Sequence, residues 1–162
     1  MAKSVFYSFH YGQDVHRVQL VRNINALEGQ PVLNPQKWEE VRRSGDLSIK
    51  KWIHDQMAYK KAVIVLIGKN TASRPWVIYE IEKAWVDKKP MLGIRIHGLS
   101  SFGDVDTAGA DPFARAANVG QIPIFDPTSL DWRGRIDSQA TYRKLTGNLE
   151  HWSSQGVIKR SW

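Results

Sequence analysis

The segment Ala62–Ile67, which reads Ala-Val-Ile-Val-Leu-Ile and ends at Gly68, limits the possible folds of this chain most strongly. Its alternate residues would point to opposite faces of a sheet, and every one of them is apolar. A strand that is apolar on both faces is typical of the centre of a parallel sheet, where helices cover both sides. The segment therefore predicts an α/β fold built around a buried parallel strand.

Other strand-like and helix-like patterns alternate along the 162 residues. Short apolar runs predict further strands at Val5–Phe9, Met91–Ile96 and Ile122–Phe125. Helical spacing of apolar residues predicts helices over 14–27, from about Asp46 to Met57, over 75–87 and within the C-terminal region 138–156. This alternation favours one domain over residues 1–162, with a central parallel sheet and helices on both faces.

Two irregular segments and two helix starts complete the predicted layout. Gly and Pro residues predict a loop over 29–37, and the Gly- and Asp-rich stretch 98–120 predicts a long loop that is either functional or mobile. Asp14 and Asp46 each precede a helical pattern, so we expect Asp14 to cap its helix and Asp46 to cap or open the next one.

Trp76 and Glu80 are the first candidates for chemistry. They are four residues apart and share one face of the predicted helix, beside an apolar face formed by Val77, Ile81 and Trp85. Ligands of parallel sheets bind at the carboxyl ends of the strands, which is where this helix begins. A carboxyl at the edge of a buried face can have a perturbed pKa and act on a substrate. The alternative is a solvated glutamate beside a core tryptophan.

Several other reaction classes lack the residues that they need. The absence of cysteine excludes thiol catalysis, disulfides and iron–sulfur clusters. Ser8, His10 and Asp14 lack the glycine pattern of a nucleophile elbow, which argues against a hydrolase triad. The five histidines show no metal-binding spacing, so no metal site is predicted, and no glycine-rich phosphate loop is present.

The net charge of +7 suggests an anionic partner. The 23 basic residues occur mainly as scattered pairs, which argues against a nucleic-acid partner. The chain has no run of apolar residues long enough to span a membrane and no N-terminal signal pattern, so we expect it in the cytoplasm. Of the seven tryptophans, Trp52 and Trp85 are predicted in the core, and Trp38 and Trp76 near a pocket.

A combination of short blocks resembles the TIR (Toll/interleukin-1 receptor) domain family. The blocks are Val5-Phe6-Tyr7-Ser8-Phe9-His10-Tyr11, Gly45 with the following helix, Ala62–Gly68 and Ser73-Arg74-Pro75-Trp76 through Glu80-Ile81. Trp76 and Glu80 match the W-x-x-x-E motif of TIR enzymes. The group that includes the TIR protein of the bacterial Thoeris antiphage system resembles this chain most, over residues 3 to about 115. Its further matches are Trp38-Glu39, Gly45-Asp46, Leu66-Ile67-Gly68 and Asp111-Pro112-Phe113.

The resemblance implies a flavodoxin-like fold and cleavage or cyclisation of NAD⁺, which is the substrate, so no separate cofactor is expected. It implies that Glu80 is catalytic and that the substrate pocket includes Ser8, Phe9, His10, Trp38, Asp46 and Trp76. The implied product is an isomer of cyclic ADP-ribose that activates a partner effector, and a homo-oligomer is possible. The Arg-Asp and Pro-Gly signature of Toll-receptor TIR domains is missing, which argues against a receptor-adaptor role. The alternative is a TIR-like module that binds a partner or a nucleotide without catalysis.

Overall fold

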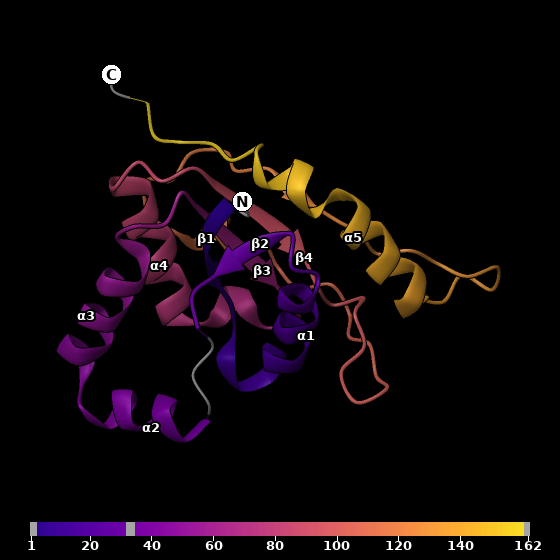
Figure 1. Ribbon diagram of the computed structural model, residues 1–162, viewed down its shortest axis with the longest axis horizontal. Helices are drawn as coiled ribbons and strands as arrows, with labels where there is room; N and C mark the ends of the chain where they lie inside the picture. Colours follow the sequence, from indigo (N-terminus) through magenta and orange to yellow (C-terminus); the bar gives the residue numbers. More distant parts are fainter. Residues whose placement is uncertain (1–2, 32–34, 161–162) are drawn as a thin grey trace.

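A five-stranded parallel sheet in the order β2-β1-β3-β4-β5 forms the centre of the computed structural model, which describes residues 3–31 and 35–160 (Figure 1). The strands are β1 (Lys3–Ser8), β2 (Leu27–Gly29), β3 (Ala62–Ile67), β4 (Met91–Arg95) and β5 (Ile124–Phe125). Each neighbouring pair is parallel. The predicted α/β class, the parallel sheet and the central place of β3 are therefore confirmed.

Helices cover both faces of this sheet (Figure 1). They are α1 (Tyr11–Asn23), α2 (Pro35–Arg43), α3 (Asp46–Met57), α4 (Pro75–Val86) and α5 (Ser138–Ser153). One apolar core lies between the sheet and the pair α1 and α5, and a second lies between the sheet and the pair α3 and α4. None of the helices in the described ranges combines the length and apolarity needed to cross a bilayer.

Strand β3 supplies both cores by simple alternation. Ala62, Ile64 and Leu66 pack on the α1 and α5 side. Val63, Val65 and Ile67 pack on the α3 and α4 side, and all six residues are fully buried. The unbroken apolar run is thus the direct consequence of a strand with two covered faces.

The first helix and the strand after it differ from the prediction. Helix α1 ends at Asn23, and Leu27 lies in the short edge strand β2 instead of extending the helical face. Asn25 adopts a φ of +59°, a conformation that asparagine tolerates and that separates the helix from the strand. At the other end, the backbone N–H of Asp14 already donates to the carbonyl of His10. Asp14 is therefore a buried residue inside the first turns, and its predicted capping role is wrong.

The loop predicted over 29–37 is shorter in the structure, because regular elements take up both of its ends. Gly29 belongs to β2 and Pro35 begins α2, a helix that apolar periodicity did not indicate. Residues 32–34 lie outside the described residues. Elsewhere, α3 begins at Asp46 as predicted, and α4 ends at Val86, one residue before the predicted end.

The segment 98–120 contains the short 3₁₀ helix η2 (Phe113–Arg115) and is attached at several points to the core. Arg17 of α1 donates to the backbone carbonyls of Leu99 and Asp104 and forms an ion pair of 3.1 Å with Asp106. Farther along, the carbonyl of Gly109 accepts a hydrogen bond from Arg95. Buried polar contacts, in place of regular secondary structure, thus hold the segment against the body of the protein.

Candidate functional site

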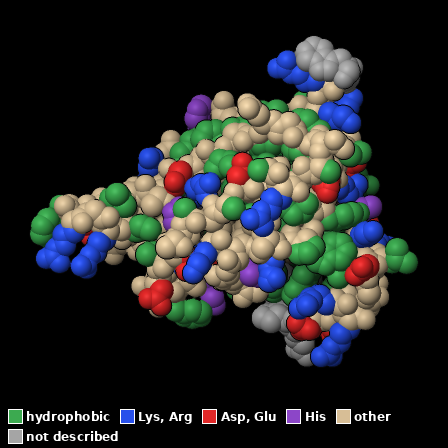
Figure 2. Space-filling view, turned by 180° about the vertical axis from the view of Figure 1, so that it is seen from behind, with side chains coloured by type: hydrophobic (Ala, Val, Ile, Leu, Met, Phe, Trp, Pro, Cys, Tyr) green, Lys and Arg blue, Asp and Glu red, His purple; other side chains and the backbone are tan. Residues whose placement is uncertain are grey.

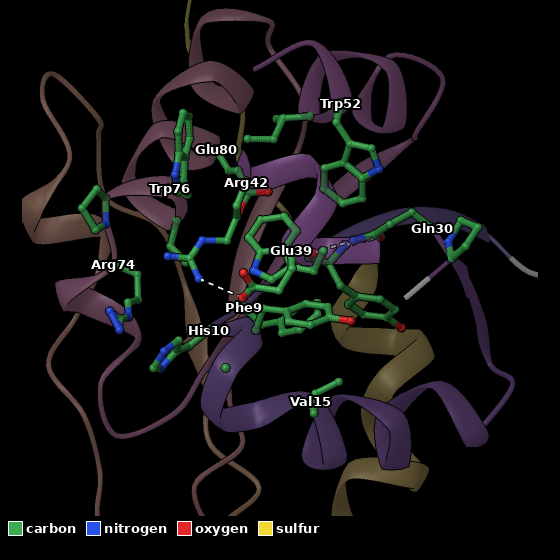
Figure 3. A pocket seen from close by; sticks show the side chains of 18 residues that line it. Phe9, His10, Val15, Gln30, Glu39, Arg42, Trp52, Arg74, Trp76 and Glu80 are labelled. Carbon is green, nitrogen blue, oxygen red and sulfur yellow. Dashed lines mark hydrogen bonds and ion pairs between the residues drawn. The ribbon is translucent and has the colours of Figure 1, made fainter. Parts of the chain in front are cut away.

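A pocket of about 560 Å³ lies at the carboxyl end of β1 (Figure 3). Strand β1 has β2 on one side and β3 on the other, so the pocket occupies the topological switch point of the sheet. Its walls come from the segments after β1 and β2, from Arg74 just before α4 and from helices α1 to α4. They include Phe9, His10, Tyr11, Gln30, Trp38, Glu39, Arg42, Trp52, Arg74, Trp76 and Glu80. The location agrees with the rule that ligands of parallel sheets bind at such points.

Glu80 is the most deeply buried acidic residue of the pocket wall. Only 8% of the residue is exposed, and its Oε1 accepts a hydrogen bond of 2.8 Å from the Ser8 hydroxyl. Burial raises the pKa of Glu80 to about 8, and the bond from Ser8 opposes this rise. In the ligand-free pocket at neutral pH the carboxyl is mainly protonated, and a cationic ligand would favour its ionised form.

Four aromatic rings form one side of the pocket, and we call Phe9, Tyr11, Trp38 and Trp52 the aromatic wall. Phe9 stacks on Tyr11 with ring centroids 5.8 Å apart, and Tyr11 stacks on Trp38 at 5.2 Å. Trp38 and Trp52 form an edge-type contact with ring centroids 6.0 Å apart and planes inclined by 67°. Such a wall offers flat apolar surface to a planar ring, and stacking on it is favourable for any nucleobase.

Trp76 lies in the first turn of α4, one turn before Glu80, and is half-buried. Its ring contacts Tyr79 edge-to-face at 5.5 Å. The Tyr79 hydroxyl in turn lies 2.6 Å from Nε2 of His54 on α3. These contacts fix the orientation of Trp76, so its position in the pocket wall is set by packing between α3 and α4.

Cationic and neutral nitrogen groups line another part of the pocket (Figure 3). Arg74 precedes α4, and Arg42 extends from α2, where it forms an exposed ion pair of 3.4 Å with Glu39. Burial lowers the pKa of His10, the positive charge of Arg74 lowers it further, and the Gln13 side chain opposes both effects. His10 is therefore neutral at pH 7, while the two arginines keep positive charge at the pocket.

The structure brings together most of the residues predicted for the site. Phe9, His10, Trp38, Trp76 and Glu80 line the pocket. Ser8 does not line it, because the residue is fully buried behind Glu80. Asp46 is exposed at the start of α3 and is not part of the pocket wall.

Other pocket residues were missed or misplaced in the prediction. Trp52, predicted in the core, is partly buried against the core on the α3 and α4 side and also lines the pocket, which helical spacing alone does not reveal. Gln30 was assigned to a loop. Its side-chain amide pairs with the backbone N–H and carbonyl of Tyr7 and so adds one rung to the short strand β2. Over residues 3–31 and 35–160, no group of three or more His, Asp or Glu side chains is placed to hold a metal ion.

A five-stranded flavodoxin-like sheet, with a buried glutamate from α4 at its switch point, is the architecture of a TIR-like domain. The family model of the TIR-like domain of the Thoeris protein ThsB matches residues 6–101, more than half of the chain. A protein of Bacillus cereus (strain MSX-D12) named "Putative cyclic ADP-D-ribose synthase ThsB1" is 36% identical over 155 residues, which covers 88% of this chain and 80% of that protein. The chain belongs to the Thoeris ThsB family of TIR-like domains, as the resemblance predicted.

Proposed function

We propose that this protein is an antiphage signalling enzyme that breaks the nicotinamide–ribose bond of NAD⁺ and forms a cyclic ADP-ribose isomer. The proposal is carried by Glu80, a buried carboxyl held by Ser8 in a pocket of dinucleotide-compatible chemistry. The name of the Bacillus cereus relative, a cyclic ADP-D-ribose synthase, supports the reaction class and the cyclic product. The product would act as a signal on a partner effector protein.

The reaction needs a negative group more than it needs an acid. Nicotinamide in NAD⁺ carries a positive charge and leaves as a neutral molecule, so nothing has to protonate it. The ribose that remains develops positive charge, as in glycoside cleavage, and a nearby carboxylate stabilises it. The positive nicotinamide ring would also lower the raised pKa of Glu80 and shift the carboxyl toward its ionised form.

The remaining groups of the pocket suit the rest of a dinucleotide. The aromatic wall can stack a base, and Arg42 and Arg74 can bind the phosphate oxygens. Positive charge elsewhere does not favour a nucleic acid, because Lys and Arg side chains are dispersed over the face in Figure 2 without forming a continuous band. The charge of +7 is therefore better explained as surface charge around an anionic small substrate.

The nucleophile that attacks the ribose decides the product. Water would give linear ADP-ribose, whereas a group of the same NAD⁺ molecule would give a cyclic product. Each route releases nicotinamide and one proton. Because the proposed product is cyclic, hydrolysis would be a side reaction of this enzyme. Mass spectrometry of the products separates the two routes.

The test is to incubate the wild type and Glu80→Gln with NAD⁺, with and without lysate from phage-infected cells, and to quantify nicotinamide and ADP-ribose species. The wild type should release nicotinamide and Glu80→Gln should lose at least 100-fold of that rate, as expected for a residue that stabilises transition-state charge. Glu82→Gln, on the same helix, is the matched control and should retain activity. Equal turnover by the wild type and Glu80→Gln would contradict the proposal. Binding of NAD⁺ without turnover under either condition would favour the non-enzymatic alternative.

A further inference from the structure

Ser8 has a different place from the one predicted for a substrate-contacting residue. It is the last residue of β1, pairs with Val65 of β3 in the register of the sheet, and is fully buried. Its hydroxyl points to α4 and donates to Oε1 of Glu80 at 2.8 Å. A ligand in the pocket would therefore meet Glu80 and not Ser8.

The bond from Ser8 makes the two oxygens of the Glu80 carboxyl different. Oε1 is occupied by the hydroxyl, and within the described residues this is the single hydrogen bond that the carboxyl receives. The exposed fraction of Glu80 opens into the pocket, so Oε2 is the oxygen available to a ligand. Ser8 belongs to β1, an interior strand of the sheet, so its position is rigid. Its hydroxyl therefore holds the Glu80 carboxyl in one orientation.

Apolar neighbours strengthen the effect of this one bond. Ile53 and Val77 line the pocket together with Glu80, and their apolar side chains offer it no hydrogen bond. A hydroxyl that donates to a carboxyl favours its ionised form, and the effect is greatest where water is excluded. The other charged or titratable residues lining the pocket are Tyr7, His10, Tyr11, Glu39, Arg42 and Arg74, none of which is hydrogen-bonded to Glu80 in the described part of the chain.

We propose that Ser8 is a positioning residue that directs Oε2 of Glu80 into the pocket and favours the ionised carboxyl, and that it does not bind substrate itself. This inference deepens the proposed function, because an oriented carboxylate is what the developing positive charge on the ribose requires. Its structural part, the control of the Glu80 carboxyl, holds whichever ligand the pocket binds.

The first experiment measures the Glu80 carboxyl directly. Protein labelled with ¹³C at the glutamate carboxyl is titrated by NMR, and Glu80→Gln identifies the signal of Glu80. Ser8→Ala should raise the pKa of Glu80 by about one unit, the effect expected for losing one hydrogen bond to a charged group. Ser4→Ala, on the same strand, is the control and should leave this pKa unchanged. If Ser8→Ala fails to fold, Ser8→Cys keeps the size of the side chain and replaces the hydroxyl by a weak donor.

The second experiment measures nicotinamide release against pH. Ser8→Ala should lower kcat about tenfold with a change in KM below twofold, and should move the rising limb of the pH profile upward by about one unit. Ser8→Thr, which keeps a hydroxyl, should restore most of kcat and the original limb.

The outcomes separate the possible roles of Ser8. A raised KM with an unmoved pH limb would make Ser8 a substrate contact, and a lower melting temperature with an unchanged Glu80 titration would make it a packing residue. Either result overturns the inference. The NMR titration does not depend on turnover, so an inactive wild type would count against the proposed function while the titration still decides the role of Ser8.

Discussion

Trp38 of α2 stacks on Tyr11 of α1 with ring centroids 5.2 Å apart and ring planes inclined by 26°. The same indole meets Trp52 of α3, so one side chain joins three helices at the pocket. Through this contact α2 contributes to the site, whereas Val41 of the same helix packs against the core on the α3 and α4 side. The position of Trp38 makes it the residue whose loss should affect ligand binding most selectively.

Replacing Trp38 by alanine should raise KM for NAD⁺ about 10-fold, because base–aromatic stacking contributes about 1 to 3 kcal/mol. The kcat value should change less, since Trp38 stacks on Tyr11 and, within the described residues, forms no hydrogen bond with Glu80. Trp38→Phe should retain most of the affinity. Steady-state kinetics of nicotinamide release provides the measurement, and Trp132→Ala is the control because Trp132 is 87% exposed and outside the pocket. An unchanged KM in Trp38→Ala would show that the base does not bind at the aromatic wall.

Arg74→Ala should weaken NAD⁺ binding and make the remaining affinity less sensitive to salt, because a positive charge at the pocket is lost. We expect a KM increase of about 5- to 20-fold at 50 mM salt that becomes smaller at 500 mM salt. Arg133→Ala, in an exposed turn outside the pocket, should behave as the wild type. The same loss of affinity at both salt concentrations would indicate a role in packing instead of charge.

The contribution of Glu80 to the stability of the wild type should fall as pH rises from about 5 to 8. The pKa of Glu80 is about 8 in the folded protein and near 4.5 in the unfolded chain, so the folded state binds the extra proton over this interval. Glu80→Gln cannot ionise and should lack that dependence, gaining on the order of 3 to 5 kcal/mol over the wild type above pH 8. Urea unfolding at pH 5, 7 and 9 tests this, with Glu82→Gln as the control. Parallel curves for all three proteins would show that Glu80 ionises freely.

Arg17→Met should destabilise the fold by about 3 to 5 kcal/mol, because it leaves the buried carboxyl of Asp14 and the side chain of Asp106 without their cation. It should also release the backbone carbonyls of Leu99 and Asp104. The loss should be smaller at pH 5, because the pKa of Asp14 is already raised to about 6 by burial, against the lowering effect of Arg17. Chemical denaturation of Arg17→Met and of Arg42→Met, whose ion pair is exposed, gives the comparison.

The main features of the fold could be predicted from sequence where a pattern was long and had one explanation. The run Ala62–Ile67 identified the central strand, and the spacing around Ile49 and Ile53 identified α3 with its start at Asp46. Strand β2 was missed because three residues are too short to show alternation, and Leu27 also continued the spacing of the preceding helix. The positive φ angle of Asn25 separates the helix from the strand, and the pattern of apolar residues does not reveal it.

The pocket was predictable in place but less so in detail. The family resemblance indicated Phe9 and His10 as pocket residues, and its W-x-x-x-E motif indicated Trp76 and Glu80. Burial could not be inferred for Ser8, since nothing in its neighbours along the chain shows that α4 covers it. Contacts between residues far apart in the sequence decide such points.

Gly68, at the end of β3, lies directly against the buried carboxyl of Asp14, and a Cβ at this position would be 2.1 Å from the Asp14 Oδ2 atom. The two positions should therefore be inherited together. Among relatives that keep aspartate at the position of Asp14, glycine should occupy the position of Gly68, and a larger residue there should accompany a smaller or apolar one in place of the aspartate. The residues at these two positions, which are 54 residues apart in the chain, should therefore covary among the members of the family.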